Sequence, residues 1–282
     1  MISINTNNGG LFAAKAASQS QATIDSAMQR LSTGSRINNA KDDAAGQAIA
    51  TRLTAEIQGL EIASRNVADG QSLVDTAEGA LQETHTLLLR MREIGVQAAN
   101  GTLSTSDNEA LDAEFQQLIE EVDRIAGNTT FAGQELLDGT YSSVNFQVGT
   151  GAGEVITVSI AGASSSDIGT TTGSAAVADL NSAVINTAAD ADAAIASVDK
   201  ALEEISTARG SLGAVSNRLG STMSNLDQIA VNLTSSQGRI ADADFAQETG
   251  NLAKNQILQQ AATAMIAQAN ASKSTILTLV RG

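Results

Sequence analysis

The hydrophobic positions along the chain form two long seven-residue repeats, one in each half of the sequence. The first contains Leu53, Leu60, Val67, Val74, Leu81 and Leu88, and the second contains Val198, Ile205, Leu212, Leu219, Leu226 and Leu233. Sustained heptads place a narrow apolar seam along one side of a helix, and that seam must pack on a partner helix to escape water. We therefore predict that the N-terminal and C-terminal segments pair as a long antiparallel coiled coil or helical-bundle rod.

The same patterns place the other elements. Helical spacing predicts helices over residues 11–33, 43–99, 106–126, 190–233 and 242–279, with a break at 235–238. The period changes to two around Val144, Phe146 and Val148, which predicts a β-hairpin near 143–160. Residues 161–190 are a low-complexity run of small and polar residues, which predicts a surface excursion or a weak helix.

Composition agrees with a thin helical bundle. The apolar fraction is carried largely by Ala, aromatic residues make up only 2% of the chain, and proline is absent. Aromatic side chains normally dominate the burial in globular cores, and proline is the usual breaker of helices. The predicted fold class is mainly α, with a small β-hairpin insert.

The charge of the chain limits the kinds of molecule that it can bind. The net charge is −15, but residues 1–41 and 249–282 are mildly basic, so the negative charge lies in the middle of the chain. An acidic surface argues against nucleic acid as a partner, because phosphate contacts need clustered Lys and Arg. No apolar run is long enough for a membrane span or a cleaved signal peptide.

Few residues could carry catalysis. The chain has a single histidine, His85, and no cysteine, which excludes thiolate chemistry and multi-histidine metal motifs. We therefore predict no enzymatic activity, no cofactor and no metal. A second line of mostly apolar positions runs half a period away from the second repeat, and Arg209 and Ser216 interrupt this line. The interruption indicates either a local shift of the seam or a pair of polar residues that sets the register of the two helices.

Several segments resemble the bacterial flagellins. Near the N-terminus they are LSTGSRINNAKDDAAGQAIA (31–50), ASRNVADGQS (63–72), TAEGAL (76–81) and REIGVQAAN (92–100). Near the C-terminus they are LGAVSNRL (212–219), RIADADF (239–245) and QILQQAAT (256–263). The motifs follow the order of the family, and the resemblance covers about residues 1–160 and 195–282.

The resemblance implies a subunit that is exported through the flagellar type III apparatus, without a cleaved signal peptide, and polymerises into the extracellular filament used for swimming. It implies that residues 1–42 and 236–282 form a terminal helical inner core that becomes ordered on assembly. Residues 43–175 and 187–235 would form a rod-like helical domain with the hairpin, and 161–190 would be a short remnant where other flagellins insert outer domains.

The resemblance also implies partners. These are other copies of the chain in a helical filament, an export chaperone on the C-terminal segment, and hook-associated junction and cap proteins. A Toll-like innate receptor would contact Arg90, Ile94 and Glu114, a surface that also serves filament packing. Two alternatives remain open, namely a hook–filament junction protein and a flagellin-like surface binding protein.

Overall fold

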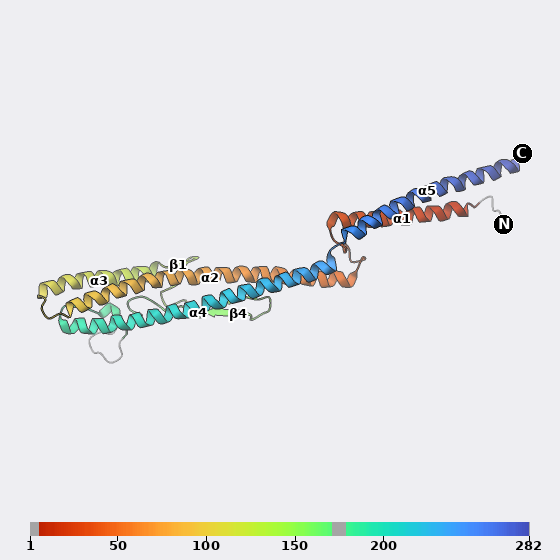
Figure 1. The fold of residues 1–282 in the computed structure, drawn as a ribbon. Coiled ribbons are helices and arrows are strands. Elements are labelled where there is room, and N and C mark those ends of the chain that lie inside the picture. Colours follow the sequence, from red (N-terminus) through yellow and green to blue (C-terminus); the bar gives the residue numbers. More distant parts are fainter. Residues whose placement is uncertain (1–5, 171–178, 282) are drawn as a thin grey trace. The chain divides into compact units, whose positions relative to one another are not determined.

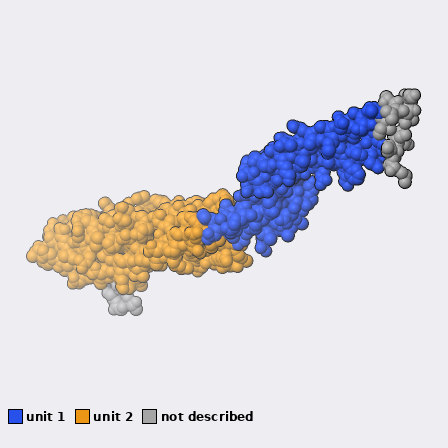
Figure 2. Space-filling view, turned by 45° about the vertical axis from the view of Figure 1, so that its right-hand side comes forward, with its two compact units in different colours: residues 1–57, 231–282 blue, residues 58–230 orange. Residues whose placement is uncertain are grey.

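The computed structural model describes residues 6–170 and 179–281. The chain divides into two compact units, coloured separately in Figure 2. Unit 1 comprises residues 1–57 and 231–282, and unit 2 comprises residues 58–230. The part of the low-complexity run at 171–178 lies outside the described residues.

The described residues are mainly helical, as predicted, and carry two small antiparallel hairpins (Figure 1). The helices are α1 (Asn8–Thr33), α2 (Ala44–Ala98), α3 (Thr105–Asn128), the 3₁₀ helix η1 (Leu180–Ser182), α4 (Ala188–Ala241) and α5 (Phe245–Arg281). The strands are β1 (Thr130–Phe131), β2 (Gln134–Glu135), β3 (Val144–Gln147) and β4 (Val155–Val158).

In unit 1, α1 and α5 run side by side in opposite directions. The Asn7 side-chain amide donates to Asn270 at 3.0 Å at one end of the pair, and Arg30 forms an ion pair with Glu248 at 2.9 Å at the other. The residues that α1 buries are small or follow a helical spacing: Ala13, Ser20, Ile24 and Ala27. The predicted pairing of the two ends of the chain is therefore confirmed.

The predicted break at 235–238 is wrong, because α4 continues to Ala241. The Ser236 hydroxyl donates to the Asn232 carbonyl within the helix, so this polar run does not interrupt the ladder. Arg36 donates hydrogen bonds to the last two carbonyls of α4. Its guanidinium donates to the Ile240 oxygen at 2.8 Å, and its backbone amide donates to the Ala241 oxygen at 2.6 Å.

In unit 2, α2 and α4 are antiparallel and exchange polar contacts at regular intervals. The pairs are Gln71 with Ser216, Glu78 with Arg209, and Arg92 with Asp199. Contacts nearer the C-terminus of α2 thus fall nearer the N-terminus of α4, as an antiparallel pair requires. Arg209 and Ser216 both bind the facing helix, which favours the interpretation of a polar register device over a local shift of the seam.

The two seven-residue repeats form much of the apolar interior. All their members are buried except Leu233, which is half-buried. In unit 2 a third helix adds larger side chains to this interior, and α3 buries Phe115, Ile119 and Val122. Burial of this apolar surface is the main force that holds the three helices together.

The hairpin of β3 and β4 confirms the one predicted near 143–160. Val144 faces Val158 in the antiparallel register, and Ile156 and Val158 are buried on one face. The hairpin approaches α2 at Gly70, where an added Cβ would lie 3.2 Å from Phe146. This glycine therefore gives the aromatic ring room against the helix.

The described parts of the low-complexity run, residues 161–170 and 179–187, are packed against helices and contain only the 3₁₀ helix η1. Carboxylates on α3 and α4 accept hydrogen bonds from their backbone amides: Asp123 from Ser165 at 2.7 Å, Asp112 from Ile185 at 2.9 Å, and Glu204 from Gly169 at 2.9 Å. Charge-assisted hydrogen bonds thus hold the backbone of this segment, and Ile168, Leu180 and Ile185 bury their side chains beside them.

Two neighbouring leucines of α2 provide a test of the core. Leu88 has no exposed area, whereas Leu89 is 45% exposed. We expect Leu88→Ala to lower the free energy of unfolding by about 2–5 kcal/mol, because it leaves a cavity. Leu89→Ala should change it by about 0.5 kcal/mol or less. Urea denaturation followed by circular dichroism measures both, and equal losses would contradict this description of the core.

Asp123 provides a second test. Its carboxylate accepts from both the amide and the hydroxyl of buried Ser165, so Asp123→Ala leaves these donors unpaired at a cost of about 1–3 kcal/mol. We expect amide hydrogen exchange in residues 161–170 to quicken by about tenfold. Glu120→Ala, an exposed change on the same helix, is the control. Unchanged exchange in the Asp123 variant would show that the carboxylate does not hold the segment.

Candidate assembly surface

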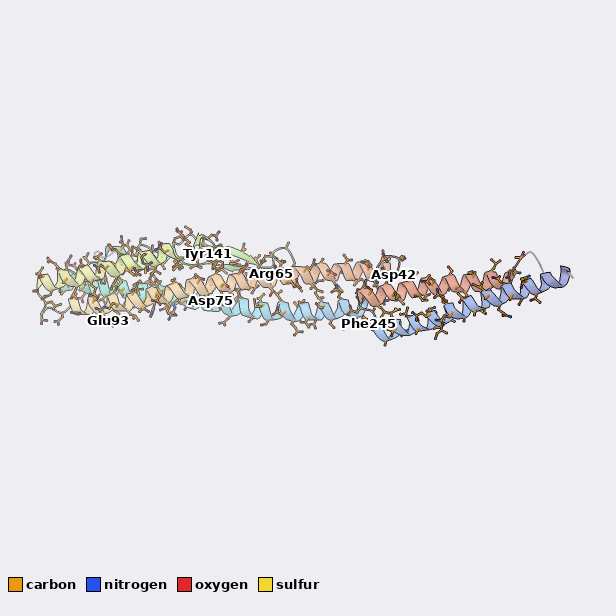
Figure 3. All side chains as sticks on the ribbon, turned by 90° about the horizontal axis from the view of Figure 1, so that it is seen from above. Asp42, Arg65, Asp75, Glu93, Tyr141 and Phe245 are labelled. Carbon is orange, nitrogen blue, oxygen red and sulfur yellow. The ribbon has the colours of Figure 1, made fainter. Side chains whose placement is uncertain are left out.

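Unit 1 leaves many large apolar side chains in contact with water. Phe12 is 76% exposed and Ile257 is 64% exposed. The exposed set on α1 and α5 is Leu11, Phe12, Met28, Phe245, Ile257, Leu258 and Met265. Figure 3 labels Phe245 at the first turn of α5. Single exposed apolar residues are ordinary, but a group of this size along one helix pair marks an interaction surface.

The reason lies in the spacing of residues on α5. The face that meets α1 includes Ala262, which is 2% exposed, and Glu248, which is 7% exposed. Ile257, Ala261 and Met265 follow one another at intervals of four residues, so they share a neighbouring flank of the helix. A single partner helix therefore covers the first face and leaves the flank open.

Charge distribution differs sharply between the two units. Unit 1 contains 7 acidic and 9 basic residues, whereas unit 2 contains 24 acidic and 7 basic residues. Like charges repel when surfaces of the same sign are brought together, and the effect grows as water is excluded. The nearly neutral helices of unit 1 are thus the part of the chain best suited to pack against copies of themselves.

The three residues predicted for a receptor contact do not share one environment. Arg90 on α2 donates to Glu114 on α3 at 2.8 Å, and both side chains are about half exposed. The hydrogen bond to Glu114 raises the pKa of the Arg90 guanidinium above its usual range, with a smaller contribution from Glu93. Ile94, four residues after Arg90 on the same helix, has no exposed area and is not available to touch a partner in this conformation.

The residues considered for catalysis form no assembled site. His85 is half-buried on α2, and the described ranges contain no group of three or more His, Cys, Asp or Glu positioned to hold a metal ion. Asp244 directly precedes α5 and caps its N-terminus, because its carboxylate accepts from the amides of Ala246 and Gln247. Among the described helices, none is both long and apolar enough to cross a membrane.

Sequence reasoning identified the seams but did not single out the exposed flank. Leu11 and Ile257, two of the exposed apolar residues, lie outside the spacing of the buried residues on their helices. That position was the only sign of the exposed flank in the sequence. From the sequence alone these residues are indistinguishable from core residues, because the number of helices that pack on α5 is not a local property.

Comparisons with known proteins agree with the motifs. The bacterial flagellin N-terminal helical region matches residues 4–142, and the bacterial flagellin C-terminal helical region matches residues 195–280. A flagellin of Halalkalibacterium halodurans is 44% identical over 90% of this chain and 91% of its own length. A flagellin of Bacillus subtilis is 40% identical over 99% of both chains.

A solved structure shares the fold at low identity. A putative flagellar hook-associated protein from Vibrio parahaemolyticus has a TM-score of 0.60 and 16% identity, covering 71% of this chain and all of that one. At this identity the likeness concerns the fold alone. The two matched regions and the near full-length relatives decide the family, and the chain belongs to the bacterial flagellins.

Proposed function

We propose that α1 and α5 are the surface through which this flagellar filament subunit polymerises. Flagellins are structural proteins that self-assemble into the filament used for swimming, so the chain must present a surface to copies of itself. The observation that carries the proposal is the set of exposed large apolar side chains on these two helices, such as Phe12 and Ile257. Burial of that set between subunits would supply the contact that the monomer lacks.

The same surface would make the order of the chain's two ends depend on assembly. We propose that residues 1–42 and 236–282 form the inner core of the filament and become ordered on assembly, while 43–175 and 187–235 form a rod-like helical domain. An isolated helix is costly to nucleate, and a pair with a thin interface gains little from burial. Neighbouring subunits would therefore complete the folding of the ends.

The geometry of such contacts favours an open polymer. A heterologous contact, in which one patch meets a different patch on the next copy, produces a helical filament unless its rotation closes a ring. Flank residues of α5 such as Leu258 and edge residues of α1 such as Met28 are different patches of this kind. We propose that contacts of this type propagate the filament.

We propose that other proteins also bind the exposed surface of α1 and α5. We propose that an export chaperone binds α5 in the cell before polymerisation and shields its exposed apolar side chains from water. The filament ends would contact hook-associated junction and cap proteins through the same helices. Each of these partners would bury apolar side chains that are exposed in the free subunit.

Ile257 tests the assembly surface. Ile257→Gln should leave the monomer folded, because the residue is 64% exposed. If the site is buried in the filament, the loss of about 1.5–3 kcal/mol of apolar burial should raise the critical concentration by about tenfold or more. Seeded polymerisation measured by sedimentation and electron microscopy gives this value.

Ile257→Leu keeps the apolar character and is the matched control, with near-normal polymerisation expected. Normal polymerisation of the Gln variant would remove α5 from the assembly surface. If the unaltered chain formed no long filaments from any seed, a hook–filament junction role would replace the proposal.

We also propose that the exposed pair Arg90 and Glu114 is the part of unit 2 that a Toll-like receptor would contact, whereas Ile94 is buried. The support is that an exposed charge pair can steer a protein partner and fix its orientation.

Glu114→Gln tests the receptor contact. It keeps the shape of the side chain but removes its charge, and we expect the dissociation constant for a receptor ectodomain to rise roughly fivefold, or about 1 kcal/mol. Surface plasmon resonance with the monomer measures this, and Glu109→Gln on the same helix is the control. Equal binding by both variants would exclude the pair.

A further inference from the structure

The methionines of this chain are distributed unevenly between water and the interior. Of 5 in the sequence, the structure describes Met28, Met91, Met223 and Met265. Met28 is 56% exposed and Met265 is 57% exposed, whereas Met91 has no exposed area. Met223 is half-buried on α4. The two exposed thioethers lie on α1 and α5, the helices of the proposed assembly surface.

Met28 and Met265 lie next to the buried seam between α1 and α5 but are not part of it. Met28 follows the buried residue Ala27 directly and comes four residues after buried Ile24, so it lies at the edge of the α1 seam. Met265 comes four residues after Ala261 and seven after Leu258, on the open flank of α5. A chemical change at either sulfur therefore alters the outer surface of the pair and leaves its internal contacts in place.

Exposure controls the chemistry of a thioether. A peroxide transfers one oxygen atom to the sulfur, which is oxidised by two electrons to the sulfoxide while the peroxide is reduced to water or an alcohol. The product is polar and can no longer be buried at low cost against apolar side chains. Methionine sulfoxide reductases reverse the change, so the modification is reversible.

We infer that Met28 and Met265 are redox-sensitive sites, at which oxidation of the free subunit by a peroxide blocks polymerisation while the finished filament shields the same sulfurs. The inference rests on the proposed role of α1 and α5, because only burial between subunits makes a sulfoxide costly at these positions. Buried Met91 in unit 2 provides an internal reference.

The first experiment measures reactivity without any substitution. The full-length monomer and preformed filaments are treated with hydrogen peroxide, and oxidation at each methionine is followed by peptide mass spectrometry. In the monomer, Met28 and Met265 should oxidise roughly tenfold faster than Met91. In the filament their rates should fall toward that of Met91. Equal rates at Met28 and Met265 in the monomer and the filament would overturn the inference.

The second experiment connects oxidation to assembly. Peroxide-treated monomer should lose more than about half of its seeded polymer yield and recover it after treatment with methionine sulfoxide reductases. The double variant Met28→Leu with Met265→Leu keeps apolar side chains of similar size and should polymerise whether or not peroxide is present. Met91→Leu, which retains both exposed sulfurs, should stay sensitive to peroxide.

The outcomes separate this inference from the proposed function. Full polymerisation by oxidised wild-type monomer would overturn the redox inference, while the result for Ile257→Gln would still decide the assembly surface. Loss of polymerisation in the oxidised double variant would assign the effect to other groups and would also overturn it. If the untreated double variant failed to polymerise, the protection measured on unaltered filaments would still decide the question.

Discussion

The narrowness of the seam between α1 and α5 is the constraint on which the rest of this structure depends. Small side chains such as Ala13, Ala27 and Ala262 let the two backbones approach but bury little apolar area. Two helices can cover only one face of each other, so larger residues such as Phe12 and Ile257 remain in water. The pair therefore leaves much of its large apolar surface uncovered.

Unit 2 differs in this respect. Its heptad seams are covered by a third helix, which contributes Phe115, and by the segment after it, which buries Leu136 and Leu137. Carboxylates of α3 and α4 then hold the backbone amides of the residues around 165, 169 and 185. This unit also carries most of the negative charge of the chain. Unit 2 is thus acidic and covers its own seams, whereas α1 and α5 leave large apolar side chains exposed.

The features that sequence reasoning predicted correctly are those carried by periodicity. The pairing of α2 with α4 and the hairpin of β3 and β4 follow from periods of seven and two, which leave direct marks in the local sequence. The error at 235–238 has a different origin. Polar residues such as Ser236 were compatible with a turn, but the helix persists because Arg36, about two hundred residues earlier, binds its last carbonyls. No local pattern records such a partner.

The amino-acid sequence alone was enough to establish the family, the mainly helical fold and the absence of residues for thiolate chemistry, because motifs, periods and composition are linear properties. Only the tertiary structure could distinguish Leu88 from Leu89, bury Ile94, and leave Met28 and Met265 in water. Exposure depends on how many neighbours each face of a helix receives. That number is set by the packing of distant segments, and the order of residues within any one of them does not specify it.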